Sequence, residues 1–274
     1  QSAGSNYARQ VNTLIGTKGV GLTSGYLYPG ATYPYGMVQF TPSYFSKRSG
    51  FVINQLSGGG CEHMGNFPTF PVKGKLKMSP DNILNYRINI SEEKGHAGYY
   101  EAKVQEDIHA KLTVTERTGM ASYEYPADQQ YGTVIIGGGI SATPIEQAAI
   151  VITAPNKCEG YAEGGNFCGL RTPYKVYFVA EFDTDALESG TWKRDELKPN
   201  TTFAEGEYSG VYFTFDVNKK KNIQYKIGVS YVSVENAREN LKAENTGWDF
   251  LQIQNQAESK WNHYLGKIEV EGTN

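Results

Sequence analysis

The chain of 274 residues has little net charge, few cysteines and no long apolar run. Its 26 Lys and Arg against 29 Asp and Glu leave a formal net charge of −3. This weak negative charge gives no electrostatic reason to expect binding to nucleic acid or to an anionic membrane. No stretch approaches the roughly 18 consecutive apolar residues that a membrane-spanning helix needs. The sequence therefore predicts no nucleic-acid partner and no membrane span.

Motifs for nucleotides, metals and serine nucleophiles are also missing. The glycine-rich stretches at 19–21 and 137–139 do not complete the G-x-x-x-x-G-K-[ST] pattern of a phosphate-binding loop. The four histidines are scattered, and neither C-x-x-C nor H-x-x-x-H occurs, so no zinc site is predicted. No G-x-S-x-G elbow marks a nucleophilic serine.

The three cysteines leave two alternatives open. Cys158 and Cys168 flank a glycine-rich segment that we interpret as a loop, and a disulfide bond would close it in an oxidising compartment. The alternative is two free, half-buried thiols. Cys61 is left over in the first case. The first residues are small and polar, as expected for a mature or trimmed N-terminus without a signal peptide.

Glycine and tyrosine are abundant. The chain has 31 Gly and 20 Tyr, against 12 Phe and 3 Trp. Such a composition is typical of β-rich proteins, and the excess of tyrosine suits polar ligands such as sugars. The first 45 residues are so rich in Gly, Pro and Tyr that we expect no helix there.

Short apolar or alternating segments predict a mainly β protein. Turn residues recur about every ten positions, which favours a sandwich or barrel over βαβ units. The predicted strands are 36–41, 51–56, 71–78, 99–105, 108–117, 121–125, 133–136, 174–182, 210–215 and 223–232.

The last forty or so residues change to helical periodicity. Residues 233–244 predict a short helix that begins at Ser233, and residues 248–265 predict a longer one that ends at Gly266. The apolar stripe of the longer helix consists of Trp248, Leu251, Ile253, Ala257, Trp261 and Leu265. We therefore divide the chain into a β domain at 1–232 and a helical part at 233–274.

Residues 50–71 form the segment richest in groups that suit a polar ligand. Three glycines let a ligand approach the backbone, and Ser57, Glu62 and Asn66 offer hydrogen-bonding groups. The alternative is an ordinary long hairpin loop. Glu62 and His63 are adjacent on an extended chain and point to opposite faces, so a joint proton transfer is not expected.

Other candidates have simpler explanations. The aromatic cluster near the N-terminus suits stacking on sugar rings, but aromatic side chains in a β protein are more often core; its members are Tyr26, Tyr28, Tyr33, Tyr35, Tyr44 and Phe45. Asp183 and Asp185 follow an apolar strand and are the best internal carboxylate pair for glycoside cleavage, but they are more typical of a turn.

Several segments together resemble glycoside hydrolase family 92. They are VNTLIGT at 11–17, YPGATYPYGMVQFTP at 28–42, LSGGGC at 56–61, GYY at 98–100, LTVTER at 112–117, VYFVAEF at 176–182 and LGKIEVEG at 265–272. The resemblance runs in order over nearly the whole chain, and its most specific part is the stretch at 28–42.

This resemblance implies a calcium-dependent, inverting exo-α-mannosidase that removes terminal mannose from N-glycans or mannans. Family members have an N-terminal β-sandwich, of the galactose-mutarotase-like supersandwich type, joined by linker helices to a C-terminal (α/α)6 barrel. That barrel carries the catalytic carboxylates and the calcium ligands, so the resemblance implies neither in this chain. It also implies a periplasmic or extracellular bacterial protein.

By the same resemblance, N-domain loops close one side of the sugar pocket. The expected substrate-binding residues are Ser57, Gly59, Gly60, Cys61, Glu62 and Asn66, with Tyr44, Phe45 and Arg48 as further candidates. The segment at 43–49 is shorter than in many members, which leaves the leaving-group subsite open. Its Lys47-Arg48 pair would suit a phosphorylated mannose.

Two rival hypotheses remain at this point. One is a stand-alone carbohydrate-binding or adhesin module, although such a module has no need for a C-terminal amphipathic helix. The other is a complete hydrolase that acts through Asp183, Asp185 or Glu62.

Overall fold

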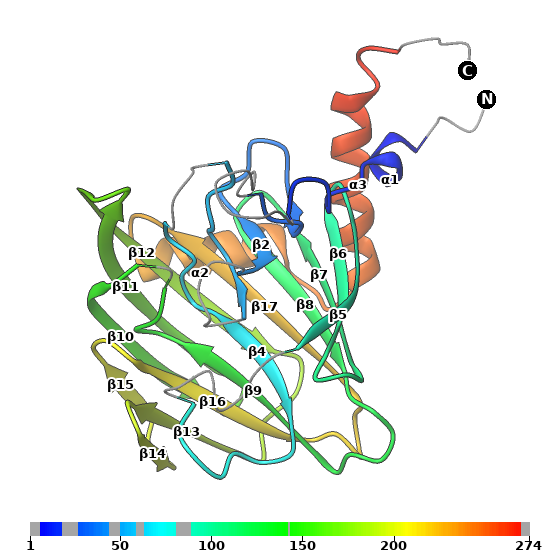
Figure 1. Ribbon diagram of the computed structural model, residues 1–274. Coiled ribbons are helices and arrows are strands. Elements are labelled where there is room, and N and C mark those ends of the chain that lie inside the picture. Colours follow the sequence, from blue (N-terminus) through cyan, green and yellow to red (C-terminus); the bar gives the residue numbers. More distant parts are fainter. Residues whose placement is uncertain are drawn as a thin grey trace.

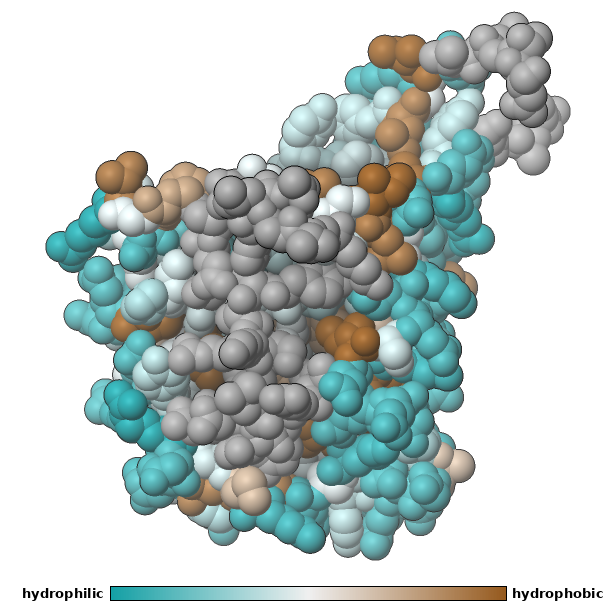
Figure 2. All heavy atoms as spheres, in the orientation of Figure 1, coloured by the Kyte–Doolittle hydropathy of each residue, from teal (hydrophilic) through white to brown (hydrophobic). Residues whose placement is uncertain are grey.

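The computed structural model describes residues 6–17, 27–43, 50–58, 63–80, 89–141 and 143–269. Two antiparallel sheets pack face to face, and helices follow at the C-terminal end of the chain (Figure 1). This confirms the expected mainly β class, a large antiparallel sandwich with C-terminal helices. The face shown in Figure 2 is largely hydrophilic, with small hydrophobic areas between. Within the described residues no helix is long and apolar enough to cross a membrane.

The two sheets differ in size and in strand order. The eight-stranded sheet has the order β1 (Ala31–Thr32), β2 (Gln39–Pro42), β3 (Phe51–Val52), β4 (Thr69–Lys73), β9 (Tyr131–Gly137), β16 (Ser209–Asp216), β13 (Glu188–Lys193) and β14 (Glu196–Pro199). The nine-stranded sheet has the order β15 (Phe203–Glu205), β10 (Ile145–Ala154), β11 (Lys157–Phe167), β12 (Leu170–Phe182), β17 (Asn222–Ser230), β8 (Thr118–Glu124), β7 (Ile108–Val114), β6 (Tyr99–Val104) and β5 (Ile90–His96). The helices are α1 (Tyr7–Gln10), α2 (Val234–Glu244) and α3 (Phe250–Leu265).

Aromatic side chains fill the space between the sheets. Phe182 of β12 is fully buried, and its ring centroid lies 4.9 Å from that of Phe213 and 5.0 Å from that of Phe215, both on β16 of the opposite sheet. These pairs join the two layers by contacts that are tilted rather than parallel, as aromatic rings prefer. Trp192 of β13 is fully buried as well.

Most predicted strands are present, but two are clearly shorter than predicted, and the one expected at 71–78 ends at Lys73. The segment predicted as a strand at 51–56 pairs only over Phe51–Val52, because the N–H of Ile53 instead donates to the carbonyl of Asn66. The structure also contains strands that the sequence did not predict, among them β10 and β11. Both are long and continuous, so the glycine-rich segment after Cys158 is a strand and not a loop.

The glycines of β11 explain this error. A Cβ built on Gly160 would lie 2.1 Å from the carbonyl oxygen of Ala149 on β10, so only glycine permits the strands to pair so closely here. Cys158 is free and buried, while Cys168 is disulfide-bonded. Neither alternative left open by the sequence holds: the two cysteines are not bonded to each other, and they are not both free. The remaining cysteine, Cys61, lies outside the described residues.

Both C-terminal helices begin and end where capping chemistry predicts. The Ser233 side chain accepts a hydrogen bond from the N–H of Asn236, and Gly266 ends α3. Of the predicted apolar stripe, Ile253 and Ala257 are buried, but Leu251 is 59% exposed. The expectation of no helix among the first 45 residues is wrong by one turn, α1, which the Asn6 side chain caps.

The turn α1 packs on α3 and holds it to the sandwich (Figure 1). The buried carboxylate of Glu258 on α3 accepts hydrogen bonds from Arg9 Nε at 3.1 Å and Gln254 Nε2 at 2.8 Å, and it lies 3.5 Å from His96 Nε2. Gly98, with φ +85°, lets the β5–β6 turn approach the helix, because a Cβ there would lie 2.9 Å from that of Ala257. The short helix α1 and the C-terminal helix α3 are thus packed against each other.

The contact between the sheets leads to a first prediction. Phe182→Ala removes a ring that touches both layers, and we expect a loss of about 3–5 kcal/mol in the free energy of unfolding. The measurement is urea unfolding followed by tryptophan fluorescence. The control is Phe203→Ala, because Phe203 is 53% exposed. Equal losses for both variants would contradict the assignment of Phe182 to the inter-sheet core.

Glu258 leads to a second prediction, on pH. Burial opposes ionisation of its carboxyl, but the hydrogen bonds from Gln254 and Arg9 and the nearby charges of His96 and Arg9 outweigh it and hold the pKa of Glu258 below its usual range. A folded-state pKa below the unfolded one adds stability above the unfolded pKa, about 4.3, that is lost as the pH falls through the folded pKa. Glu258→Gln should therefore lower stability at pH 7 more than at pH 3. Urea midpoints across this range test it, with Glu239→Gln on the exposed side of α2 as control. The prediction fails if the two variants have parallel pH profiles.

Candidate functional site

Two of the nine predicted substrate-binding residues, Ser57 and Asn66, lie in the described part of the chain. The other seven lie outside the described residues: Tyr44, Phe45, Arg48, Gly59, Gly60, Cys61 and Glu62. The site is therefore built from the residues that flank these segments.

A pocket of about 250 Å³ lies beside the start of β2 and the residues that follow β3 and β17, and we call it the Ser57 pocket. Gln39 begins β2 and forms a parallel bridge with Asn54, which places both amides at the pocket. Gln39 Nε2 donates to Ser57 Oγ at 2.8 Å. None of the described lining residues is charged: they are Thr32, Gly36, Met37, Val38, Gln39, Asn54, Gln55, Leu56, Ser57, Met64 and Tyr231. The described part of the pocket therefore offers hydrogen-bonding groups of the kind that bind neutral hydroxyls.

A network of hydrogen-bonded, buried polar groups lies behind the wall of the Ser57 pocket. Asn66 is fully buried and does not line the pocket; its Oδ1 accepts from Asn54 Nδ2 at 3.0 Å and from the hydroxyl of Tyr174 at 2.9 Å. Asn54 Oδ1 in turn accepts from the N–H of Asn66 at 2.8 Å. Asn66 Nδ2 is buried and has no partner among the described residues. This double link fixes the amide plane of Asn54 at the pocket wall.

The two tyrosines of this network remain neutral, Tyr174 as a donor to Asn66 and Tyr231 as an acceptor from Asn54. Burial raises the pKa of Tyr174 to about 12, although the hydrogen bond to Asn66 opposes the rise. Burial also raises the pKa of Tyr231, whose hydroxyl lies 3.4 Å from Asn54 Nδ2. The described residues of the network thus offer fixed dipoles and hydroxyl protons, and no acid or base that titrates near neutral pH.

The contacts of His63 are those of a residue that stabilises the fold. It is buried, its Nδ1 lies 3.1 Å from the carbonyl oxygen of Asn166, and its ring packs edge-on against that of Phe167 at 4.7 Å. Its own carbonyl accepts from Gln55 Nε2 at 2.8 Å. The side chain of His63 therefore links the segment that begins at residue 63 to the β11–β12 hairpin.

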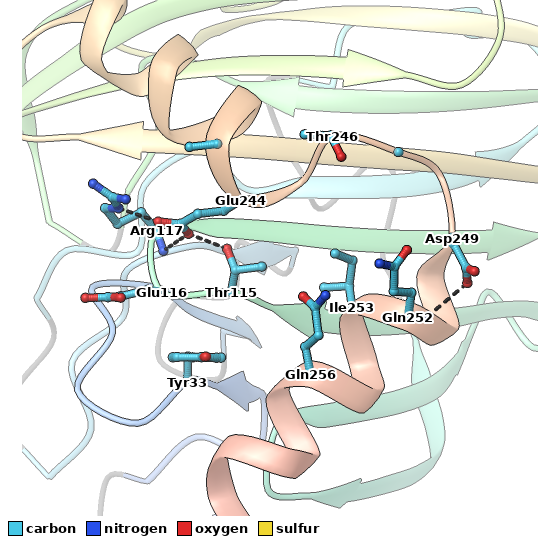
Figure 3. Close-up of a pocket in the computed structure, with 12 residues that line it drawn as sticks. Tyr33, Thr115, Glu116, Arg117, Glu244, Thr246, Asp249, Gln252, Ile253 and Gln256 are labelled. Carbon is cyan, nitrogen blue, oxygen red and sulfur yellow. Dashed lines mark hydrogen bonds and ion pairs between the residues drawn. The ribbon is translucent and has the colours of Figure 1, made fainter.

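A second, larger cleft lies between the sandwich and the helices, and we call it the corner cleft (Figure 3). Its volume is about 440 Å³. One wall is Tyr33 and the β7–β8 turn, and the other is the corner between α2 and α3. The lining residues are Tyr33, Thr115, Glu116, Arg117, Ala243, Glu244, Thr246, Gly247, Asp249, Gln252, Ile253 and Gln256.

Glu244 fixes the two walls of the corner cleft. Its carboxylate accepts hydrogen bonds from Thr115 Oγ1 at 2.6 Å and from the N–H of Arg117 at 2.8 Å, and it forms an ion pair with Arg117 Nε (Figure 3). The next residue, Asn245, is buried, and its carbonyl accepts from the buried Lys226 Nζ at 2.9 Å. The corner is thus held by charged hydrogen bonds, which are stronger than neutral ones.

The candidate carboxylates Asp183 and Asp185 lie in the turn after β12. Asp183 Oδ1 accepts from the N–H of Gln224 at 3.1 Å, and its Oδ2 forms an ion pair with Lys220 Nζ at 2.7 Å. These bonds join the turn to β17 and to the residues that precede it. Across the described ranges, no group of three or more His, Cys, Asp or Glu side chains is arranged to hold a metal ion.

Sequence reasoning missed the corner cleft and most of the Ser57 pocket. Gln39, Asn54 and Tyr231 lie far apart along the chain and carry no shared motif. Thr115–Arg117 was assigned to the end of a strand, whereas it forms the turn to which Glu244 binds. Only tertiary packing brings these groups together.

Comparison with known protein families shows to which family this chain belongs. The family model described as the glycosyl hydrolase family 92 N-terminal domain matches residues 10–230. The chain belongs to glycoside hydrolase family 92. The model of the family 92 catalytic domain matches residues 236–274, so α3 and most of α2 fall in the first part of that domain.

Solved family 92 structures have the same fold. The family GH92 alpha-mannosidase BT3965 from Bacteroides thetaiotaomicron has a TM-score of 0.86 and 24% identity, and the match covers 98% of this chain and 39% of that one. The inverting mannosidase BT2199 from the same organism has a TM-score of 0.80 and 23% identity, over 100% of this chain and 38% of that one. An uncharacterized secreted glycosidase from Arthroderma benhamiae is 26% identical over 96% of this chain and 38% of its own length. The chain therefore spans about two fifths of the length of these relatives.

The buried network leads to a third prediction. Asn66→Ala leaves Asn54 Nδ2 and the Tyr174 hydroxyl without their shared acceptor, and we expect a loss of about 1–3 kcal/mol in the free energy of unfolding. Ser57→Ala, which removes only an exposed hydrogen bond to Gln39, should cost less than about 0.5 kcal/mol. Chemical denaturation of the two variants tests this. An Asn66 variant as stable as the unchanged protein would contradict the network.

Proposed function

We propose that this chain is the substrate-binding N-terminal part of a secreted exo-α-mannosidase that releases terminal mannose from N-glycans or mannans. The observation that carries the proposal is the ordered pair of family matches, with the N-terminal domain at 10–230 followed directly by the start of the catalytic domain at 236–274. Two similar structures are named as mannosidases, which supports mannose as the sugar. The same pair of matches supports a division into a β-sandwich at 1–232 and helices at 233–274 that lead into an (α/α)6 barrel.

The role of this chain is to bind and orient the sugar. In the proposal, the amides of Gln39 and Asn54 and the hydroxyl of Ser57 bond the hydroxyl groups of the sugar, and Asn66 acts through Asn54. Because the described lining of the Ser57 pocket is uncharged, these bonds position the ligand without proton transfer. The residues at 44, 45, 48 and 59–62 remain proposed contacts.

The catalytic pair belongs, in this proposal, to the barrel. An inverting glycosidase needs one carboxylic acid to protonate the leaving oxygen and one carboxylate to activate water on the opposite face of the ring. Asp183 is occupied by an ion pair with Lys220 and a hydrogen bond from Gln224, and does not suit either role. The described residues offer no cluster that fits calcium, so we assign the calcium ligands to the catalytic domain and derive no step through the metal.

A stand-alone carbohydrate-binding or adhesin module is the second candidate. The catalytic-domain match at 236–274 and the exposed apolar Leu251 on α3 favour the enzyme over the module. Export to the periplasm or the medium is proposed by analogy with the fungal relative, whose name describes it as secreted.

The test is release of mannose from an α-1,2-linked mannobiose by the longer protein that carries this chain. We expect release with calcium, none with a chelator, and none from the 274-residue chain alone. Gln39→Ala and Ser57→Ala should each lower kcat/KM about tenfold through lost sugar contacts. Ser91→Ala, an exposed serine on β5, is the control. Calcium-dependent release by the 274-residue chain alone would overturn the division of labour.

A further inference from the structure

We propose that the corner cleft binds an uncharged sugar unit of the same glycan, remote from the terminal mannose. This rests on the proposed function. It assigns a second carbohydrate subsite to Tyr33, Gln252 and Gln256, at the boundary between the matches to the two family domains.

The cleft has the composition of a sugar site. Gln252 and Gln256 lie one turn apart on α3, and both are exposed; neither side-chain amide has a hydrogen-bond partner among the described residues. Each planar amide offers a donor and an acceptor, which matches the hydroxyl pairs of a pyranose. The half-buried ring of Tyr33 packs against the core and offers an aromatic surface in the same cleft. Figure 3 shows Gln256 reaching from α3 toward the wall that carries Tyr33 and Thr115.

The walls of the cleft are fixed before any ligand binds. Glu244 joins the β7–β8 turn to the end of α2, and Trp261 Nε1 of α3 donates to the carbonyl of Thr32 at 2.7 Å. A preformed site loses little conformational entropy on binding. The volume of about 440 Å³ is within the range of small-molecule sites.

The charge of the cleft selects a neutral ligand. Its lining carries three carboxylates, Glu116, Glu244 and Asp249, and one cation, Arg117, which Glu244 already pairs. Phosphorylated or sulfated sugars would meet net negative charge here. The proposed ligand is thus a neutral hexose unit.

The position of the cleft links it to the Ser57 pocket. Thr32, Gly36 and Met37 line the Ser57 pocket, while Tyr33 lines the corner cleft. The N–H of Met37 also donates to the carbonyl of Glu116 at 2.9 Å, which joins this turn to the β7–β8 turn in the same wall of the corner cleft. One short turn therefore separates the two sites, and a branched or extended glycan has units on both sides of it.

The test compares two substrates of the longer protein. The double variant Gln252→Ala/Gln256→Ala should lower kcat/KM about tenfold for a neutral oligomannoside and leave that for 4-nitrophenyl α-mannoside unchanged. Alanine is the best helix former, so these exposed substitutions keep α3 intact. Asn255→Ala, an exposed amide on the same helix outside the corner cleft, is the matched control and should change neither value. Equal loss on both substrates, or loss on neither, would overturn the subsite.

Binding measurements separate this inference from the proposed function. Titration calorimetry of the neutral oligomannoside should show weaker binding by the double variant than by Asn255→Ala, whether or not the protein cleaves it. Failure to cleave any mannoside would refute the proposed function alone. Unchanged affinity in the double variant, or tighter binding of a phosphorylated oligomannoside than of the neutral one, would refute the subsite.

Discussion

The arrangement of the helices depends on the hydrogen bonds of one carboxylate, that of Glu244. It lies at the last residue of α2, where the chain must turn before α3 begins. By accepting from Thr115 and Arg117 of the β7–β8 turn, it fixes this corner against the end of the nine-stranded sheet. The residue after Glu244 is held as well, because the buried Lys226 Nζ donates to the backbone carbonyl of Asn245. The direction of α3 follows from these contacts, and with it the shape of the corner cleft.

The sequence predicted the elements whose signal is local. The capping serine at 233, the stop at Gly266 and the alternation within β6, β7 and β17 are each decided by neighbouring residues, and each was found. The strand β11 was missed for a physical reason: its glycines resemble a loop in composition, but Gly160 is required by the close approach of β10. Treating this segment as a loop also kept a Cys158–Cys168 bridge open as an alternative, whereas the strand holds Cys158 in the core, opposite Ala180 of β12.

The sites were less predictable because they are made by segments distant in the chain. Ser57 was recognisable from its glycine-rich surroundings, but its partner Gln39 was hidden within a predicted strand. Asn66 was expected to bind the sugar from its residue type and from the family resemblance, whereas the structure buries it behind Asn54. The depth of a side chain depends on tertiary packing, which residue type does not predict.

The described lining of the Ser57 pocket carries no group suited to proton transfer. The pKa values of Tyr174 and Tyr231 are raised, so both phenols stay protonated throughout the physiological range, and the ligand binding proposed for this pocket should not change with pH there. Fixed neutral dipoles also bind substrate and transition state with similar strength, which contributes affinity and orientation rather than chemistry. The proposed division between a binding sandwich and a catalytic domain is consistent with this, because acids and bases require environments that shift their pKa toward neutrality. In that proposal the hydrogen bonds of Glu244 matter for function, since a bound sugar is oriented for catalysis only if the helices that lead into the catalytic domain are held rigidly to the sandwich.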